Sequence, residues 1–394
     1  VTLSFGEEGV ALPSQSNDTD VFAAMVLYPA DLSTATVSIV YKFADGSVYL
    51  QTKSGKTLTP GHTLRLSTQI AKSDCKSSGA FFMTEAGVAE ELPTEPIGYL
   101  KVVTLGESTL SAEELTSIAG NLANGAVIDL GEATFATTEF PMDFARKTNL
   151  QEIALPRNIQ TFASEAYSGA FYNCTNLKRV TLPEGLTAIG ANCFRQCSQL
   201  ESIELPSSVR TLDIYAFYGC KLLTSVVIPE GVEAIPQFIF DSCTALTDVT
   251  LPSTLKSIGT EAFEATGLKE ITIPESVTSV EAAVFKNCKS LERIQFPDAL
   301  TAIPANLCNA CSALTTINMP SKLETVGNDA FYNCGNLQDV TFPETLKSLD
   351  ERSFGGCSAF TRIIIDIPAI ANYAFWNCAN VTSIDLGEKV TSIG

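Results

Sequence analysis

A repeating pattern of apolar and polar positions runs through the last two thirds of the chain. Each unit alternates apolar and polar residues over about six positions, as in 177–182 (LKRVTL), and a second apolar pair follows, as in 186–189 (LTAI). Alternation with a period of two predicts a short, half-buried strand, and the second pair predicts a segment that closes a coil. A proline follows the first strand in nine successive units. Because proline has no N–H, it ends the hydrogen-bond ladder of that strand.

A column of phenylalanines sets the period of the repeat. The spacings between its successive members are 27, 23, 23, 23, 23, 22, 23, 23, 23 and 21 residues. A fixed period in this range indicates a solenoid, in which each unit forms one coil and stacks on its neighbours. We therefore expect a right-handed solenoid of about 11 coils, with parallel strands and short helical turns. The column consists of Phe144, Phe171, Phe194, Phe217, Phe240, Phe263, Phe285, Cys308, Phe331, Phe354 and Phe375.

The turn that carries each phenylalanine is predicted to be helical. In 327–334 (GNDAFYNC), Ala330 and Cys334 lie four residues apart, on one face of a single helical turn. Small residues at these places would let the turn approach the core while Phe331 fills it.

The solenoid is expected to begin before the first complete unit. Ser111 and Glu114 match a capping box, and Leu115, Ile118 and Ala119 form one apolar helical face. A strand at 126–130 follows. We therefore assign 106–130 to an N-terminal cap and 131–394 to the solenoid.

The first hundred residues lack the repeat and are predicted to form strands. Apolar residues alternate in 37–43, Asp45-Gly46 predicts a tight turn, and 48–50 returns, which together predict a hairpin. The segment from Tyr99 to Leu105 is expected to be the last strand. We assign 1–105 to an antiparallel β-sandwich domain that includes a linker at 91–96.

Composition narrows the classes of function. The 394 residues are 45% hydrophobic and 18% charged, and 25 basic against 44 acidic residues give a net charge of −19. Such a surface repels nucleic acids and anionic lipids. No apolar run reaches 18 residues, so no transmembrane segment is predicted. The chain has no initiator methionine and ends in the middle of a unit, which suggests a trimmed chain whose last coil is covered by a partner or continued by further repeats.

The twelve cysteines are interpreted as core residues. Nine share one column, in which neighbouring side chains run parallel about 5 Å apart, whereas a disulfide needs converging Cβ atoms about 3.8 Å apart. They are predicted to be buried free thiols, and the C-x-x-C of Cys308 and Cys311 is expected to be core as well, in place of a redox or zinc site. Cys193 is interpreted as a small-residue replacement and Cys75 as a lone thiol. The column consists of Cys174, Cys197, Cys220, Cys243, Cys288, Cys311, Cys334, Cys357 and Cys378.

Catalytic chemistry has few candidates in this sequence. His62 is the single histidine and is interpreted as a solvated turn residue, so triads that need histidine are excluded from the solenoid. Asp248 and Glu270 occupy the same strand position on neighbouring coils and could form a carboxylate pair, although solvated surface charge is the favoured interpretation. We expect no enzyme activity, no cofactor and no metal.

The exposed face of the predicted sheet is the candidate binding surface. Its side chains are short, rich in threonine and mixed in charge, and arginines are the only members typical of protein hot spots. Aromatic residues stand instead in the turns, at Tyr172, Tyr218, Tyr332 and Trp376, where either a core edge or a binding ridge is possible. The candidate ligand-binding residues are Arg179, Thr181, Glu204, Asp248, Thr250, Glu270, Arg293, Gln295 and Arg362.

The repeat resembles a known family. The unit A-F-x-x-C…L-x-x-V-x-L-P resembles the BspA-like leucine-rich repeats of surface proteins from Bacteroidetes, treponemes and some protozoan parasites, over about residues 140–394. The first domain resembles fimbrillin-like β-sandwiches over about 30 residues. The resemblance implies an extracellular protein, often lipid-anchored to the outer membrane upstream of residue 1, whose repeats bind host matrix proteins such as fibronectin or fibrinogen, or bacterial surface proteins.

Two functions follow as hypotheses. The first is a non-enzymatic cell-surface adhesin that binds protein partners through the solenoid. The alternative is a structural or assembly component of a fimbria-like structure, in which the repeats act as a spacer. The sequence leaves the ligand and the oligomeric state open.

Overall fold

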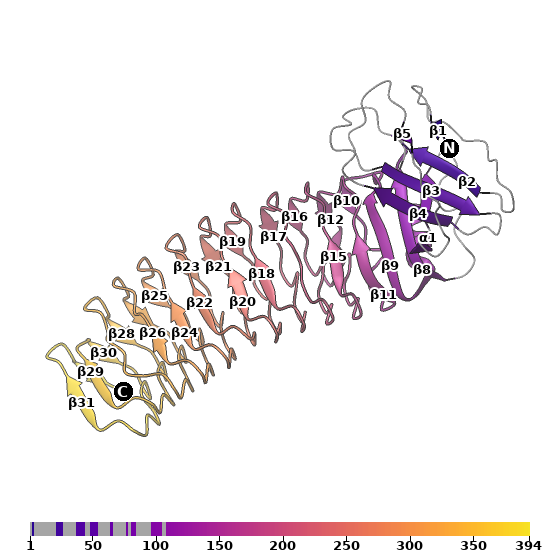
Figure 1. Cartoon of the computed structure of the whole chain (residues 1–394). Helices are drawn as coiled ribbons and strands as arrows, with labels where there is room; N and C mark the ends of the chain where they lie inside the picture. Colours follow the sequence, from indigo (N-terminus) through magenta and orange to yellow (C-terminus); the bar gives the residue numbers. More distant parts are fainter. Residues whose placement is uncertain are drawn as a thin grey trace.

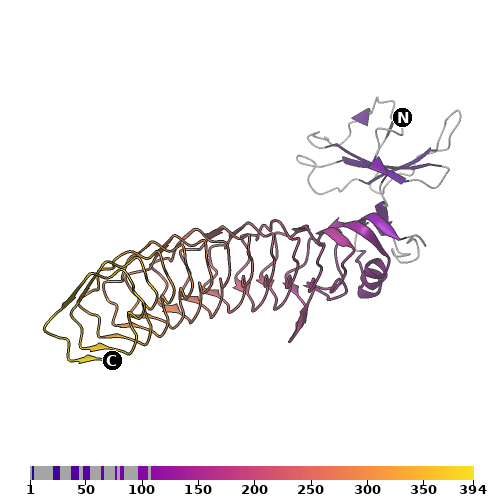
Figure 2. The ribbon, with the colours of Figure 1, turned by 90° about the horizontal axis from the view of Figure 1, so that it is seen from below.

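The protein is a long solenoid of stacked coils, with an N-terminal region at one end (Figures 1 and 2). The computed structural model describes residues 96–104 and 108–394, together with the backbone of seven short strands between residues 2 and 83. The predicted parallel-stranded solenoid is confirmed. Within these described parts, no helix is both long and apolar enough to cross a bilayer.

One long side of the solenoid, which we call the strand face, carries the strands of the first apolar segment of each unit. Each of these strands pairs in parallel with at least one neighbour, although the ladder is not continuous along the whole face. They are β7 (Ala80–Met83), β8 (Ile97–Thr104), β9 (Leu122–Glu132), β11 (Leu150–Ala154), β15 (Arg179–Thr181), β18 (Ser225–Val227), β20 (Asp248–Thr250), β22 (Glu270–Thr272), β24 (Arg293–Gln295), β26 (Thr316–Ile317), β29 (Arg362–Ile365) and β31 (Ser383–Leu386).

The expected last strand of the sandwich lies elsewhere. Strand β8 pairs in parallel with β9, so it belongs to the same sheet as the first solenoid strands. The sequence pattern gave no sign of this pairing, because β8 precedes the first recognisable unit. The boundaries of the three domains stay a prediction.

A second side of the solenoid carries two-residue strands from the second apolar pair of each unit. These strands also pair in parallel. They are β10 (Glu139–Phe140), β12 (Thr161–Phe162), β16 (Ala188–Ile189), β17 (Thr211–Leu212), β19 (Ala234–Ile235), β21 (Ser257–Ile258), β23 (Ser279–Val280), β25 (Ala302–Ile303), β27 (Thr325–Val326), β28 (Ser348–Leu349), β30 (Ala369–Ile370) and β32 (Ser392–Ile393).

The third side, which we call the turn face, carries the turns around the phenylalanine column. The predicted helical turn is wrong, because a left-handed residue stands two positions before and two positions after the phenylalanine, as at Asp329 (φ 55°) and Asn333 (φ 58°). Because of these two left-handed residues, every second backbone N–H of the turn points towards the next coil. Phe331 N donates to Ser353 O at 2.8 Å, and Asn333 N donates to Gly355 O at 2.8 Å. The turns therefore form a hydrogen-bonded ladder between coils instead of bonding within a helix.

Stacked phenylalanine rings fill the core. Phe217 and Phe240 have centroids 5.4 Å apart and Phe240 and Phe263 have centroids 5.6 Å apart, with planes inclined by 8° and 14°. All three rings are completely buried. The regular column thus forms one continuous aromatic stack through the middle coils.

The helix predicted near the start of the solenoid is confirmed, together with its capping box. Helix α1 (Ala112–Gly120) begins at Ser111, whose hydroxyl accepts from Glu114 N while the Glu114 carboxylate accepts from Ser111 N. Leu115 and Ile118 are completely buried. The helix therefore contributes its predicted apolar face to the core cluster at this end of the solenoid.

The one unit with 27 residues forms a side hairpin. Its extra residues make β13 (Ser164–Glu165) and β14 (Ser168–Gly169), an antiparallel pair that projects from the solenoid (Figure 2). Tyr167 at its tip is 82% exposed.

The strands described before residue 80 form two antiparallel sheets. The hairpin predicted around Asp45-Gly46 is confirmed in its strands, since β3 pairs with β4. The sandwich itself stays a prediction, and His62 and Cys75 lie outside the described residues. The first sheet has the order β2-β3-β4-β6 and the second pairs β1 with β5; their bounds are β1 (Thr2–Leu3), β2 (Val21–Val26), β3 (Val37–Phe43), β4 (Val48–Lys53), β5 (Leu64–Arg65) and β6 (Lys76–Ser77).

Candidate functional site

The strand face presents the predicted candidate residues to solvent. In β15, β18, β22 and β24 the middle residue is buried and its two neighbours are exposed, because side chains alternate along a strand. Parallel register places equivalent residues side by side, as for Glu270 and Arg293, or Thr272 and Gln295. All nine candidate residues are exposed, so their place on this face is as predicted.

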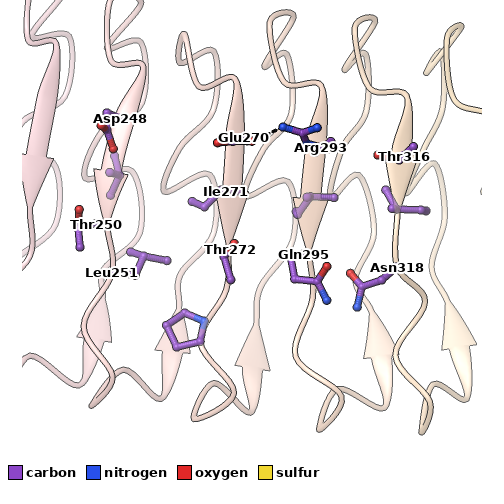
Figure 3. Close-up of a pocket in the computed structure, with 14 residues that line it drawn as sticks. Asp248, Thr250, Leu251, Glu270, Ile271, Thr272, Arg293, Gln295, Thr316 and Asn318 are labelled. Atoms are coloured by element: carbon purple, nitrogen blue, oxygen red, sulfur yellow. Dashed lines mark hydrogen bonds and ion pairs between the residues drawn. The ribbon is translucent and has the colours of Figure 1, made fainter.

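A hollow of about 810 Å³ divides the strand face in its middle (Figure 3). Five of the nine candidate residues line it, and Arg179, Thr181, Glu204 and Arg362 lie outside it. Threonine, glutamine and asparagine side chains supply hydrogen-bonding groups, and isoleucine and leucine supply apolar surface. The lining residues are Asp248, Val249, Thr250, Leu251, Glu270, Ile271, Thr272, Pro274, Arg293, Ile294, Gln295, Thr316, Ile317 and Asn318.

The hollow lies where the strand ladder is interrupted. Among the described strands, β20 ends the pair β18-β20, and β22 starts a separate sheet, β22-β24-β26. The interruption coincides with the single 22-residue unit, which has one residue between Thr266 and Leu268 where other units have two. Thr266 replaces the column cysteine, and its hydroxyl donates to Phe263 O of its own coil at 2.9 Å. Among the described strands, the face is also interrupted between β15 and β18 and between β26 and β29, beside units of 23 residues, so the shortened turn distinguishes this junction but is not the general cause of the interruptions.

Asn318 at the far edge of the hollow is fixed by the backbone of the preceding coil. Its Oδ1 accepts from Phe296 N at 2.7 Å, and its Nδ2 donates to Phe296 O at 2.8 Å. Gln295 on the neighbouring strand stands beside it (Figure 3). The hollow thus has one rigid amide at its wall.

Each candidate arginine pairs with a carboxylate of a neighbouring coil. The Arg293 Nη2–Glu270 Oε2 distance is 2.6 Å, the Arg179 Nη2–Glu152 Oε1 distance is 3.4 Å, and the Arg362 Nη2–Asp385 Oδ2 distance is 3.8 Å. Because these pairs are exposed, each contributes little to stability. The pairing orients the guanidinium groups along the face. Sequence reasoning missed it, although the 23-residue offset between Glu270 and Arg293 was its visible sign.

The two carboxylates considered for catalysis both line the hollow. Asp248 and Glu270 lie on β20 and β22, which belong to separate sheets. The Glu270 carboxylate engages Arg293 on its other side (Figure 3). The arrangement is that of a solvated, ion-paired surface.

Within residues 108–394 the column cysteines are unpaired, as predicted, and all of them are buried except Cys378, which is half-buried. Each thiol donates to a backbone carbonyl of an earlier coil, as from Cys197 Sγ to Phe171 O at 3.1 Å and from Cys220 Sγ to Phe194 O at 3.2 Å. Burial raises the pKa of Cys174 to about 12 and holds the pKa of Cys197 and Cys220 well above the usual range. The thiols therefore stay neutral and act as small core residues that link the coils.

We expect the column thiols to resist alkylation in the folded protein. In a Cys75→Ser variant, iodoacetamide should label Cys378 first, because that thiol is half-buried and its pKa is raised only to about 11. Cys197 and Cys220 should be labelled only in denaturant, with labelling measured by mass spectrometry of the peptides. Rapid labelling of Cys220 at neutral pH without denaturant would contradict the buried column.

An acidic cluster on the turn face was missed by sequence reasoning. Carboxylate oxygens of Asp241, Glu261 and Glu264 lie within 4.8 Å of one another. Lys286 Nζ lies 3.1 Å from Glu264 Oε1, and Asn287 donates to the same oxygen at 3.0 Å. Burial, then the charge of Glu264, raises the pKa of Asp241, while burial and a hydrogen bond that protonated Glu261 donates to Glu264 raise the pKa of Glu261. Asp241 and Glu264 each directly follow a column phenylalanine, and this equivalent position in neighbouring units was the sign of the cluster in the sequence.

The chain was compared with known proteins. The sequence profile of the BspA type leucine rich repeat region (6 copies) matches residues 164–292 and 278–394, more than half of the chain. No curated protein matches the chain.

Several solved structures are similar to the chain. A leucine rich cell surface protein from Faecalibacterium prausnitzii is 26% identical, with 70% of this chain and 93% of that chain covered and a TM-score of 0.43. A leucine-rich repeat protein from Bacteroides ovatus is 20% identical, with 67% and 87% covered and a TM-score of 0.41. The pneumococcal vaccine antigen PcpA is 16% identical, with 97% and 82% covered and a TM-score of 0.41.

Proposed function

Because the chain belongs to the BspA-type leucine-rich repeat family, we propose that it is a non-enzymatic cell-surface protein that binds other proteins through its strand face. The observation that carries this proposal is the hollow at the junction of β20 and β22. Solenoids use extended faces of this kind to bind partners. The site combines an ordered arginine, one fixed amide and apolar side chains, which is the composition of a protein interface.

The proposed partners are matrix proteins of a host or surface proteins of bacteria. The ligand-binding residues we propose are those of the hollow, with Arg179, Thr181, Glu204 and Arg362 as a surrounding rim. We also propose an extracellular location at the outer membrane, with a lipid anchor upstream of residue 1. The short, polar, mixed-charge side chains suit a wet protein interface, and they supply no acid–base pair for catalysis.

We expect the full chain to bind at least one member of an immobilised panel of matrix proteins, mucins and bacterial cells in a saturable manner. Arg293→Ala should weaken that binding at least about fivefold, because truncating an interface arginine typically costs about 1 kcal/mol or more. Lys347→Ala is the control, since it breaks an exposed ion pair between neighbouring coils, Lys347 Nζ–Glu324 Oε2 at 2.7 Å, beside β28 and away from the strand face. Surface plasmon resonance at two salt concentrations measures both.

If the two substitutions weakened binding equally, the hollow would not be the binding site, and the loss of affinity would be a general effect of surface charge. Binding to no member of the panel would favour the alternative, in which the repeats are a spacer in a surface structure.

A further inference from the structure

The turn face carries the same three-coil arrangement of aromatic residues twice. In its first copy, Tyr172 and Tyr218 follow the column phenylalanine of the first and third coils, and Tyr215 stands two positions before that of the third coil. Between them, Arg195 follows the phenylalanine of the second coil. We call these four residues the filled cage.

The second copy has aromatic residues at the same three positions but no arginine between them. Tyr332 and Trp376 take the places of the first and third coils, Tyr373 stands two positions before the third phenylalanine, and Gly355 occupies the place of the arginine. We call Tyr332, Trp376 and Tyr373, with Gly355 beneath them, the open cage. It lies in the last coils of the solenoid (Figure 1).

In the filled cage, three tyrosine rings surround the guanidinium group of Arg195. The Cζ atom of Arg195 lies 4.7 Å from the ring centroid of Tyr215, 5.2 Å from that of Tyr218 and 6.0 Å from that of Tyr172. One of its terminal nitrogens donates to Asn192 Oδ1 at 3.0 Å. Stacking of a guanidinium on several rings is a favourable cation–π arrangement.

The open cage has nearly parallel walls and a floor without a side chain. The rings of Tyr332 and Trp376 are inclined by 15°, with centroids 6.4 Å apart. Gly355 is buried, and a Cβ on it would lie 3.0 Å from Tyr332 Cδ2. A flat group held between two parallel rings needs ring planes about 7 Å apart. The Tyr332 ring leans over Gly355, so an entering group displaces that ring or the ring of Trp376, which is 49% exposed.

The chain's own nearby arginine is engaged elsewhere. Arg352 Cζ lies 5.6 Å from the ring centroid of Tyr332. Its Nε lies 2.9 Å from Asp329 Oδ1, and one Nη donates to Asp329 Oδ2 at 2.9 Å. This two-point ion pair holds the guanidinium of Arg352 on the carboxylate.

A contribution to stability does not explain why a tyrosine occupies position 373, the third wall of the open cage. Tyr373 has a left-handed backbone (φ 62°) and its side chain is 62% exposed, so the residue is strained and buries little. Tyr215 and Phe238 have the same left-handed conformation at this turn position in other coils, so the conformation belongs to the turn itself. The exposure of the Tyr373 side chain is the feature that its packing does not explain.

We propose that the open cage binds an arginine side chain of a partner protein, whose guanidinium takes the place that Arg195 holds in the filled cage. The net charge of −19 favours a basic segment as the source of that arginine. The cage is on the turn face, separate from the hollow, and adds a second contact region with a stated chemistry.

Tryptophan fluorescence of the full chain tests this proposal directly, because Trp376 is the single tryptophan. We expect acetyl-Gly-Arg-Gly-amide to change the emission in a saturable manner. The lysine peptide and the uncharged, flat citrulline peptide should each bind at least tenfold more weakly. Tyr332→Ala should weaken binding of the arginine peptide at least tenfold, whereas Tyr172→Ala, the same change in the filled cage, should leave it unaltered.

A gain of binding provides the second arm. Arg195→Gly empties the filled cage, so calorimetry with the arginine peptide should find two sites in place of one. If Tyr332→Ala unfolds, as seen by circular dichroism, Tyr373→Ala replaces it with the same expected loss. Equal responses to the three peptides, no saturable response up to the solubility of the arginine peptide, or full binding by Tyr373→Ala would overturn the proposal. Arg293→Ala should bind the peptide normally, which separates this outcome from that of the strand face.

Discussion

Phe240→Ala is expected to lower the free energy of unfolding by about 3–5 kcal/mol. The ring is completely buried and stacks between those of Phe217 and Phe263. Its removal leaves a cavity that the neighbouring coils cannot close, because each is held by backbone hydrogen bonds on both sides, such as that from Phe240 N to Ala262 O at 2.9 Å. Urea unfolding followed by circular dichroism measures the loss.

Val227→Ala is the control for this prediction. Val227 lies on the strand face and is 64% exposed, so its truncation should change the stability by less than about 0.5 kcal/mol. If the two substitutions cost the same, the phenylalanine stack would not be the main support of the middle coils.

Gly259→Ala and Gly185→Ala are expected to have effects of opposite sign. A Cβ on Gly259 would lie 2.6 Å from Gln237 N and 2.9 Å from Pro236 C, both backbone atoms of the preceding coil, so the coils must separate. Such overpacking typically costs about 1–3 kcal/mol. Gly185 has no atom within 4 Å of the corresponding position, so alanine there should raise the stability by about 0.4–1 kcal/mol through the unfolded chain.

The melting temperatures of the two variants, measured beside the parent protein, decide this prediction. A higher melting temperature for Gly259→Ala than for Gly185→Ala would show that the spacing of the coils is not fixed by contact at Gly259.

Which residues lie side by side was predictable, because in a solenoid the residues at the same position of successive units stack on one another. Val180, Ile271 and Ile294 were expected to point inward from alternation alone, and each is buried. The capping box at Ser111 was likewise visible, because its two residue types and their spacing encode the hydrogen bonds directly.

The geometry of the turns was not predictable from residue spacing. Ala330 and Cys334 are four residues apart in a helix and also in a curl with two left-handed residues, so the spacing does not distinguish the two. The hollow was missed for a related reason. The repeat pattern predicts equivalent strands in every unit, whereas the strand ladder is interrupted between β20 and β22 and at two other places among the described strands, and the spacing of apolar residues does not indicate where.

The interrupted junction also has a mechanical meaning. On the strand face no shared sheet joins β20 to β22 among the described strands, whereas on the second side β19, β21 and β23 form one continuous sheet across the same place. A solenoid whose coils are joined by a continuous sheet on one side and an interrupted sheet on the other bends most easily at the interruption, in the direction that opens the interrupted side. The strand face is likewise interrupted between β26 and β29, where β27 and β28 pair on the second side. The solenoid is thus a lever with more than one one-sided joint, and under shear between two surfaces the strand face would open at these joints before any coil unravels.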